Sequence, residues 1–304
     1  MSKKLRKKTI VQPEDLSSVD LHRLLLTAIA PRPIALASTV DQEGRVNLSP
    51  FSYFNVFSTR PPVCIISPSR RVKDNTEKHT LENVREVPEV CINIVNYAMT
   101  RQMSLASSDY AKGVNEFGKA GFTEAPCMHI RPPRVDQAPV SLECRVDEVK
   151  ALGSEGGAGN LIICRILSLH LDDTYLRADG TLSPDKLDLV GRMGEDWYCR
   201  ADDASMFRVP KPGSPLGMGV EALPERIRLS HVLTGNDLGK LGHLTSLPSP
   251  DAIEERRETE KCKSILRRCE GDADRLEREL HEEAKRLIED NHLIEAMEVM
   301  MIIK

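Results

Sequence analysis

The size, composition and charge of the chain restrict what it can be. Its 304 residues, 40% hydrophobic and 29% charged, can bury a core in one large domain with an appendage or in two modest domains. The net charge of −4 gives no reason to expect nucleic acid or an anionic membrane as the main partner. No stretch approaches the roughly 18 apolar residues of a transmembrane helix.

The cysteines and the N-terminus indicate the compartment. Eight cysteines without any C-x-x-C pair are typical of reduced thiols in a cytoplasmic protein, rather than of a metal site or a disulfide scaffold. The basic cluster within residues 3–8 is followed by a polar stretch at 12–18, where a signal peptide would need an apolar run. We therefore expect residues 1–19 to form a flexible N-terminal arm.

Short β-like runs dominate from residue 34 to about residue 170. Five of them are predicted to be strands: 34–40, 62–66, 90–95, 140–146 and 161–171. The loop at 41–44 should reverse the chain into a further strand, and the glycine-rich 153–159 should form a hairpin. Many short antiparallel strands with few helices favour a mainly β, α+β domain built on a β-barrel.

Three helices are predicted within this β-rich region. Asp74 as the N-cap and Glu77 at position N3 form a capping box, which predicts a helix from there to about Arg85, before Pro88. Two shorter helices are expected at 100–106 and 115–119.

The pattern changes after about Pro250. Apolar residues at three- and four-residue steps form a helical seam in a charged segment, and residues 251–304 hold 11 Lys and Arg against 16 Asp and Glu. Gly271 interrupts the seam, so one helix and two helices both remain open. We expect a C-terminal helical extension at 251–304 that packs on the protein or supports a dimer, after an extended linker or packing segment at 211–250.

Three segments concentrate groups that can hold a phosphorylated planar ligand. They are the strand end at 38–39, the segment 47–54 and the segment 67–75. The last one places Arg70, Arg71 and Lys73 ahead of the predicted helix, where a phosphate would meet free N–H groups and the positive end of the helix dipole. Each segment taken alone also has the residue types of an ordinary turn.

Several motifs occur together in one order. They are PRPIALAST at 31–39, NLSPFS at 47–52, PPV at 61–63, KDN at 73–75 and CINIV at 91–95, followed by KGVNEF at 112–117, AGFT at 120–123, GRMG at 191–194 and WY at 197–198. In this order they resemble the flavin reductase-like FMN-binding split-barrel family, in particular the flavoredoxin group. The resemblance covers roughly residues 20–210 and ends before the acidic helical extension.

The resemblance implies a homodimer of split β-barrels with FMN near the subunit interface. Ser49 and Ser52 would then contact the ribityl chain or the phosphate, Lys73 would neutralise the phosphate, and Arg70 would be a second cation. Family members commonly have Lys-Asp-Thr where this chain ends the motif with Asn75, so an amide replaces the hydroxyl there. The candidate cofactor-binding residues are Ser38, Thr39, Asn47, Leu48, Ser49, Ser52, Tyr53, Ser67, Arg70, Lys73, Asp74, Asn75 and Arg192.

The implied function is that of an FMN-binding oxidoreductase of the NAD(P)H:flavin oxidoreductase type. Reduced nicotinamide or another donor would supply the electrons. The chemistry belongs to the flavin, which the protein orients and shields from water, so no side chain is assigned a catalytic role. His79 and His170 are interpreted as ordinary helix-surface and strand residues.

Three other functions remain open at this point. The chain could be a flavoredoxin-like electron carrier or a flavin-binding protein without NAD(P)H turnover. A pyridoxamine-phosphate oxidase-like enzyme would need a second phosphate site, for which Arg131 and Arg134 are candidates. A non-catalytic interaction protein would instead bind its partner through the helical extension.

Overall fold

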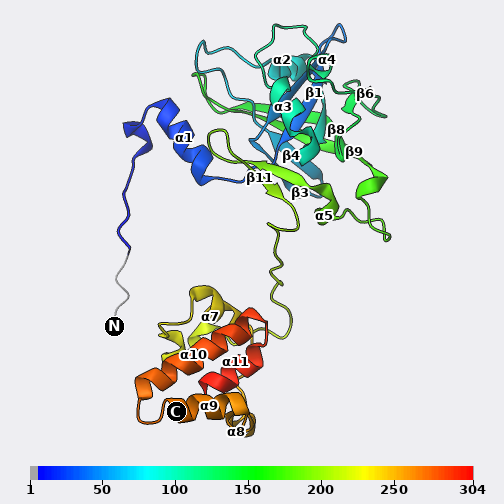
Figure 1. The fold of residues 1–304 in the computed structure, drawn as a ribbon. Helices are drawn as coiled ribbons and strands as arrows, with labels where there is room; N and C mark the ends of the chain where they lie inside the picture. Colours follow the sequence, from blue (N-terminus) through cyan, green and yellow to red (C-terminus); the bar gives the residue numbers. More distant parts are fainter. Residues whose placement is uncertain (1–5, 304) are drawn as a thin grey trace. The chain divides into compact units, whose positions relative to one another are not determined.

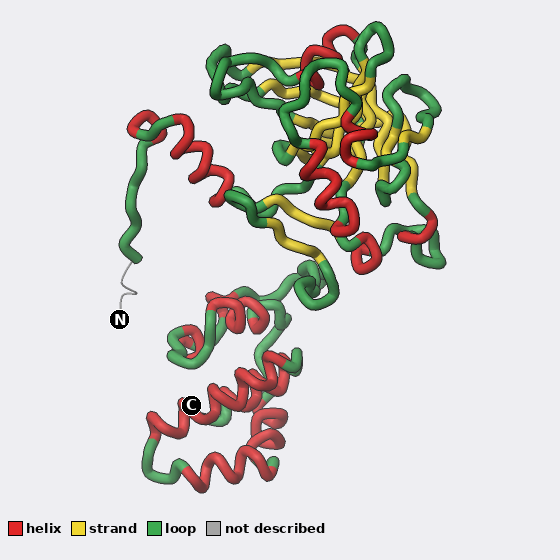
Figure 2. The backbone as a smooth tube through the Cα atoms, turned by 45° about the horizontal axis from the view of Figure 1, so that its top comes forward, coloured by secondary structure: helices red, strands yellow, loops and turns green. Residues whose placement is uncertain are grey.

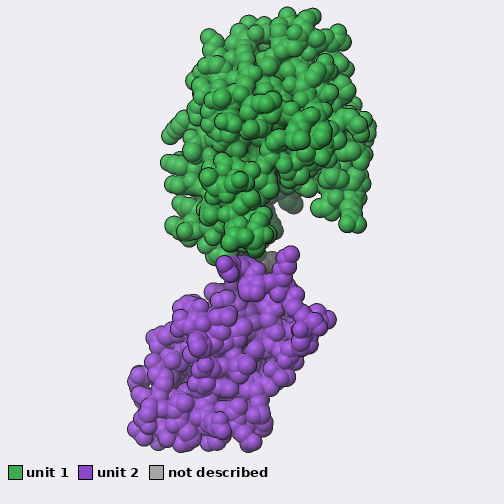
Figure 3. Space-filling view, turned by 90° about the vertical axis from the view of Figure 1, so that its right-hand side faces the viewer, with its two compact units in different colours: residues 1–207 green, residues 208–304 purple. Residues whose placement is uncertain are grey.

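The computed structural model describes residues 6–303, and these fall into two compact units. Unit 1 ends at Phe207 and unit 2 begins at Arg208, as the two colours of Figure 3 show. Apolar clusters fill each unit separately, so each unit has a hydrophobic core of its own. In residues 6–303 we find no helix whose length and apolarity would let it cross a membrane.

Unit 1 is built on a seven-stranded antiparallel sheet with the order β2-β1-β5-β8-β9-β4-β3. Its strands are β1 (Ala35–Val40), β2 (Val46–Phe51), β3 (Phe54–Thr59), β4 (Pro62–Ile66), β5 (Glu89–Ile94), β8 (Val140–Ala151) and β9 (Asn160–Leu171). The five strands predicted from the sequence are all present, and the glycine-rich segment at 153–159 joins β8 to β9 as expected.

The positions of β2 and β3 show that this sheet curls into a barrel. The two strands lie at opposite edges of the sheet, yet only Ser52 and Tyr53 separate them in the chain. A flat sheet of seven strands is far too wide for two residues to span, because neighbouring strands lie about 4.8 Å apart. The sheet therefore bends until its edges approach each other, and the predicted split β-barrel is confirmed (Figure 1).

The core of unit 1 lies on both faces of the sheet. All six residues of β1 are buried, and its side chains alternate between two apolar clusters. One cluster contains Ala37, Ile92 and Ile162, and the other contains Leu36 and residues of α3 and α4. A strand buried on both faces reads as a nearly continuous apolar run, which is why residues 34–40 show little polar alternation.

The remaining elements of unit 1 cover or extend the barrel. They are η1 (Pro13–Asp15), α1 (Ser18–Ala28), α2 (His79–Glu86), η2 (Tyr97–Met99), α3 (Thr100–Ala106), α4 (Glu116–Ala120), β6 (Glu124–Ala125), β7 (Arg134–Val135), η3 (Asp173–Tyr175), α5 (Pro184–Leu187), β10 (Leu189–Arg192) and β11 (Tyr198–Ala201). The two short helices predicted at 100–106 and 115–119 correspond to α3 and α4.

The predicted start of the helix at Asp74 is wrong. Helix α2 begins at His79, and its N-cap residue is Lys78. Asp74 instead closes a local turn, where its Oδ1 accepts from the Thr76 N–H at 3.0 Å and from the Thr76 hydroxyl at 2.6 Å. Glu77 pairs with arginine side chains, so neither member of the predicted capping box is free to cap.

The N-terminal arm expected at 1–19 is described only in part, because residues 1–5 lie outside the described residues. The described part is exposed or half-buried, and it contains η1 and the first turn of α1. Ser17 caps α1 by accepting from the Asp20 N–H at 3.1 Å.

Unit 2 consists of helices joined by loops in its described residues (Figure 2). They are η4 (Val220–Ala222), α6 (Glu225–Arg228), α7 (Gly235–Leu241), α8 (Pro250–Arg257), α9 (Glu260–Arg268), α10 (Ala273–Glu289) and α11 (Leu293–Met300). Gly271 has φ of +81° between α9 and α10, so the seam forms separate helices. Within residues 211–250, expected to be an extended linker or packing segment, Leu223, Ile227 and Leu241 are buried in the unit 2 core.

Candidate functional site

A continuous groove runs along β2 and the turn between β2 and β3 in unit 1. Its central hollow of about 210 Å³ is lined mainly by serine hydroxyls, with Tyr53 and Lys78. A hollow of about 310 Å³ adjoins it at Ser52, Tyr53 and Ser67, which line both. A narrow hollow of about 20 Å³ adjoins the other end at Ser49, Lys78 and Ser107. We call the three hollows together the groove, with an apolar end, a centre and a polar end.

The apolar end suits a flat aromatic ring. Its walls are Ile29, Pro31, Pro33, Phe54, Phe57, Ile65 and Leu161, with Arg32, Ser52, Tyr53, Asn55 and Ser67. Tyr53 and Phe57 remain 39% and 65% exposed, so their rings are accessible to a ligand or to another protein surface. The short β2–β3 connection positions these aromatic residues, since it places Tyr53, Phe54 and Phe57 beside the barrel opening.

Arg32 holds the apolar end together. Its side chain is buried, and its guanidinium donates to the carbonyls of Leu26 at 2.5 Å, Ile29 at 2.8 Å and Met193 at 2.9 Å. Its Nε donates to the Ser52 hydroxyl at 3.3 Å. Burial lowers the pKa of Arg32, although a guanidinium stays charged at any working pH. One side chain thus joins the end of α1, the β2–β3 turn and the end of β10.

The polar end holds charged groups of both signs, the cations Lys78 and Arg71 and the carboxylates Asp109 and Glu116. Lys78 is half-buried there beside Arg71 and His79, and it forms no ion pair with any carboxylate of residues 6–303. Burial lowers the pKa of Lys78, and the nearby Arg71 lowers it further. A lysine at a helix N-cap also opposes the positive end of the helix dipole. A bound anion would relieve all three unfavourable effects.

Five of the residues predicted from the sequence line the groove, and they come from β2 and the strand connections. They are Asn47, Ser49, Ser52, Tyr53 and Ser67. Asn47 is held in place by its Nδ2, which donates to the Thr80 hydroxyl at 2.9 Å. The next residue, Leu48, is buried, and its N–H donates to Glu116 Oε2 at 2.8 Å. Burial raises the pKa of Glu116, which lines the polar end of the groove.

The structure places Ser38 and Thr39 inside the protein rather than on the groove. Both are fully buried on β1. The Ser38 hydroxyl donates to the carbonyl of Pro133, and the Thr39 hydroxyl accepts from Asn83 Nδ2 at 3.1 Å. Their hydrogen bonds therefore serve the packing of β1 against its neighbours.

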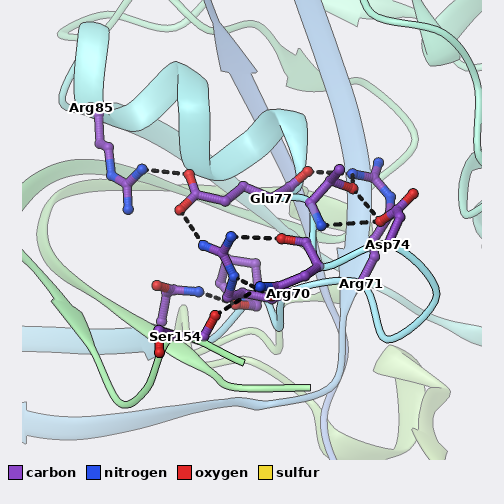
Figure 4. A network of polar contacts seen from close by, with 10 residues as sticks. Arg70, Arg71, Asp74, Glu77, Arg85 and Ser154 are labelled. Atoms are coloured by element: carbon purple, nitrogen blue, oxygen red, sulfur yellow. Dashed lines mark hydrogen bonds and ion pairs between the residues drawn. The ribbon is translucent and has the colours of Figure 1, made fainter. Parts of the chain in front are cut away.

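Four more predicted residues lie beside the groove, and Figure 4 shows the network of hydrogen bonds and ion pairs around Arg70 and Asp74. Arg70 binds Glu77 at 2.7 Å and the Asn75 side chain at 2.7 Å, and Glu77 also binds Arg85. Lys73 is 64% exposed and pairs with Asp109, while Asp74 closes the turn described above.

Arg192, His170, Arg131 and Arg134 do not line the groove, whereas His79 lines its polar end. Arg192 lies on β10, and its guanidinium stacks on Tyr198 at 4.6 Å. His170 pairs with the buried Glu143, whose carboxylate also accepts two backbone N–H groups. Burial opposes ionisation of Glu143, but these hydrogen bonds lower its pKa to about 2. Arg131 and Arg134 are paired with Glu89 at 3.3 Å and Asp136 at 3.0 Å.

Sequence reasoning missed Lys78 and Arg32 as site residues. The prediction that the helix starts at Asp74 is the reason that Lys78 was missed. A helix starting there would place Lys78 in its second turn, away from the N-terminus. A lysine directly before a helix that begins at His79 would have signalled an anion site. Arg32 lies in a quoted motif, but its contacts reach as far as Met193, and no local pattern indicates those.

Comparisons with known proteins agree with the fold of unit 1. The model of the flavin reductase like domain matches residues 27–184, all within unit 1. An uncharacterised protein of Aquifex aeolicus is 34% identical over 181 residues, which are 60% of this chain and 90% of that protein. Among solved structures, 2-nitrobenzoate 2-nitroreductase of Pseudomonas fluorescens superposes with a TM-score of 0.59 at 26% identity, over 68% of this chain and all of that one. Nitrilotriacetate monooxygenase component B of Bacillus cereus has a TM-score of 0.63 at 24% identity, over 67% and 100% of the two chains, and shows the shared fold.

Proposed function

This chain belongs to the flavin reductase like family of flavin-related oxidoreductases, and from that membership we propose that it binds FMN in the groove as an FMN-dependent oxidoreductase. The groove offers, in order, an apolar end, a row of hydroxyls and a polar end where Lys78 and Arg71 lie. FMN offers in the same order a flat ring, a ribityl chain and a phosphate. The match in chemical order supports one bound mononucleotide.

Lys78 is the observation that carries this proposal. It is half-buried, it forms no ion pair with a carboxylate of residues 6–303, and burial lowers its pKa, so an anion bound beside it would stabilise its charged form. In the proposal, Lys78 and Arg71 hold the phosphate, with His79 beside them. Ser49, Ser52 and Ser67 contact the ribityl chain, and Tyr53 lies against the ring. Of the residues predicted from the sequence, the proposal retains those that line the groove.

The protein residues contribute binding, orientation and exclusion of water. A bound flavin supplies the hydride and electron transfer itself. Arg32 orients Ser52 at the border between the apolar end and the centre. The apolar walls keep bulk water from one side of the ring, and the exposed Tyr53 and Phe57 leave the other side accessible to a donor.

We further propose reduced nicotinamide as the electron donor, with a flavoredoxin-like electron carrier as the alternative. The similar Pseudomonas fluorescens protein is a 2-nitrobenzoate 2-nitroreductase, which supports reductive chemistry on this fold. All eight cysteines are free thiols, which supports a reducing, cytoplasmic setting.

A homodimer is part of the same proposal. Large apolar side chains are exposed on the barrel strands, including Val56 at 51% and Phe57 at 65% on β3 and Leu169 at 58% on β9. Exposed apolar side chains gathered on one sheet mark protein interfaces. Phe57 also lines the apolar end of the groove, so a second copy on β3 would help to close the flavin site.

The test begins with an absorbance spectrum of the purified protein and mass identification of any molecule released on denaturation. We expect flavin bands and FMN. Anaerobic stopped-flow mixing with NADH and with NADPH then distinguishes an enzyme that takes electrons from reduced nicotinamide from a flavoredoxin-like electron carrier. Bleaching of the flavin bands supports nicotinamide as donor, and bands that neither nucleotide bleaches support the electron carrier. A colourless protein that also fails to bind added FMN contradicts the whole proposal.

A further inference from the structure

Arg32 is the one charged residue among the described residues that line the apolar end of the groove. The other walls of this hollow are apolar, aromatic and uncharged polar side chains. The Arg32 side chain is buried, so its charge acts in surroundings that screen it much less than water does. The guanidinium of Arg32 is therefore the main source of electrostatic potential at this end.

The positive charge of Arg32 is not neutralised by a carboxylate of residues 6–303. The four hydrogen bonds of the guanidinium go to three backbone carbonyls and to the Ser52 hydroxyl, which are all neutral acceptors. The neighbouring Arg192 has a carboxylate partner in Asp196 at 3.7 Å, whereas Arg32 forms no ion pair with any described Asp or Glu. An arginine paired with a carboxylate is nearly neutral toward its surroundings, but Arg32 presents a full positive charge.

The groups packed against Arg32 from the other elements leave this charge in place. The end of α1 contributes carbonyls, the β2–β3 turn contributes Ser52 and Tyr53, and β10 contributes Arg192. Burial and, to a smaller extent, the positive charge of Arg192 lower the pKa of Arg32. A guanidinium nevertheless stays protonated at every working pH, so the charge is permanent.

Reduction of a flavin places negative charge on its ring. The oxidised ring is neutral. A hydride from reduced nicotinamide carries two electrons and one proton to the ring, which gains one negative charge while the donor becomes oxidised nicotinamide. A second proton, taken from water, then neutralises the reduced ring. A fixed positive charge beside the ring favours the negatively charged form over both neutral forms.

We propose that Arg32 sets the redox balance of bound FMN, because its charge at the apolar end stabilises the reduced, negatively charged ring. The inference rests on the proposed function and deepens it by assigning an electrostatic role to one residue. The apolar walls strengthen the effect, since they exclude water that would screen the charge. The bound flavin should accept a hydride more readily than free FMN, and the reduced ring should remain an anion.

The first measurement is the reduction potential of FMN bound to the full-length wild-type chain. It is taken by anaerobic equilibration with a reference dye between about pH 5 and pH 8, beside free FMN. Each proton taken up with the two electrons changes the equilibrium constant tenfold per pH unit, so one proton gives a slope of about 30 mV per pH unit and two protons give about 60 mV. We expect the change between these slopes to occur at a lower pH for bound FMN than for free FMN.

Two variants of Arg32 then separate its charge from its hydrogen bonds. Arg32→Gln removes the charge and keeps an amide donor, and Arg32→Lys, the matched control, keeps the charge. We expect Arg32→Gln to weaken binding of reduced FMN relative to oxidised FMN roughly tenfold, which equals a fall in potential of about 30 mV. Arg32→Lys should change this ratio by less than about threefold. Arg177→Met, at an exposed arginine outside the groove, should leave the ratio unchanged.

Three results would overturn the inference while leaving FMN binding intact. One is a change of slope for bound wild type at the same pH as for free FMN or at a higher pH, and this measurement decides the matter even if neither Arg32 variant folds. Another is an unchanged ratio in Arg32→Gln. The third is an equal fall in potential in Arg32→Gln and Arg32→Lys, which would assign the effect to lost hydrogen bonds. A wild-type chain that binds no FMN would overturn the proposed function and the inference together.

Discussion

The two units of this chain differ in where their notable polar groups lie. In unit 1, Lys78 and several serine hydroxyls line a groove along β2. Unit 2 has one apolar cluster from seven helical segments, and its buried His281 is 2% exposed inside it. The family match lies entirely in unit 1, so the helices of unit 2 lie outside the residues that the family model matches.

The largest expected effect tests whether the units are energetically independent. Leu241 is fully buried in unit 2, and Leu241→Ala should lower the free energy of unfolding of that unit by about 2–5 kcal/mol through the cavity it leaves. Flavin binding by unit 1 should stay at the wild-type level. Thermal unfolding followed by circular dichroism and FMN titration measure the two effects. Leu247→Ala, at a 40% exposed leucine, is the control, and loss of FMN binding in Leu241→Ala would refute independence.

The second effect concerns the stability of unit 1. Arg32→Met removes a buried guanidinium that serves three carbonyls and the Ser52 hydroxyl, so we expect a loss of about 3 kcal/mol or more. Denaturant unfolding of the chain ending at Phe207 isolates this unit. The control is Arg177→Met at an exposed arginine. An Arg32→Met variant as stable as wild type would show that the hydrogen bonds of Arg32 add nothing to the free energy of unfolding.

The third effect concerns the affinity of unit 1 for FMN. Lys78→Met should weaken FMN binding by about 1.5–3 kcal/mol, or roughly 10- to 100-fold in Kd, because it removes a charge-assisted contact to the phosphate. Riboflavin, which has no phosphate, should bind the variant and the wild type equally. Lys186→Met, at an exposed lysine outside the groove, is the control. If riboflavin binding weakened as much as FMN binding, the result would instead indicate that the variant disturbs the fold.

The smallest effect is a pH dependence confined to unit 2. His281 Nδ1 lies 2.8 Å from the Ser230 hydroxyl, which already accepts from the Val232 and Leu233 N–H groups and so donates to the ring. Burial lowers the pKa of His281 in the folded chain. Below about pH 6.5 the unfolded chain therefore binds a proton that the folded chain resists, and stability falls by at most about 1.4 kcal/mol per pH unit.

This loss should begin near pH 6.5 and stop once the pH passes the lowered pKa of the folded state. Unfolding of unit 2 measured between pH 7.5 and pH 5, with His281→Gln beside wild type, isolates the contribution. His292→Gln is the matched control, since the His292 side chain is 55% exposed. Identical pH profiles for wild type and His281→Gln would exclude the buried histidine as the cause.

The difference between prediction and structure is clearest in the segment 70–78. Its cations and its capping residues were evident in the sequence, and the segment does adjoin the groove. Which cation faces the groove was not evident, because the same local pattern fits a helix starting at Asp74 and a turn closed by Asp74. Contacts with Asp109, 36 residues away from Lys73, engage Lys73 outside the groove. Lys78 is left without such a partner in residues 6–303.

The sequence by itself determined the elements whose signals are local. Alternation and apolar runs located five barrel strands, and the hydroxyl-rich segment at 47–54 marked the centre of the groove. Only the tertiary structure decided that the chain forms separate helices on the two sides of Gly271, and that β2 and β3 lie at opposite edges of a curled sheet. It also decided that Arg32 joins segments 161 residues apart and that residues 211–250 supply part of a helical core. The physical reason is that burial and ion pairing depend on distant partners, whereas periodicity and turn chemistry depend on near neighbours in the chain.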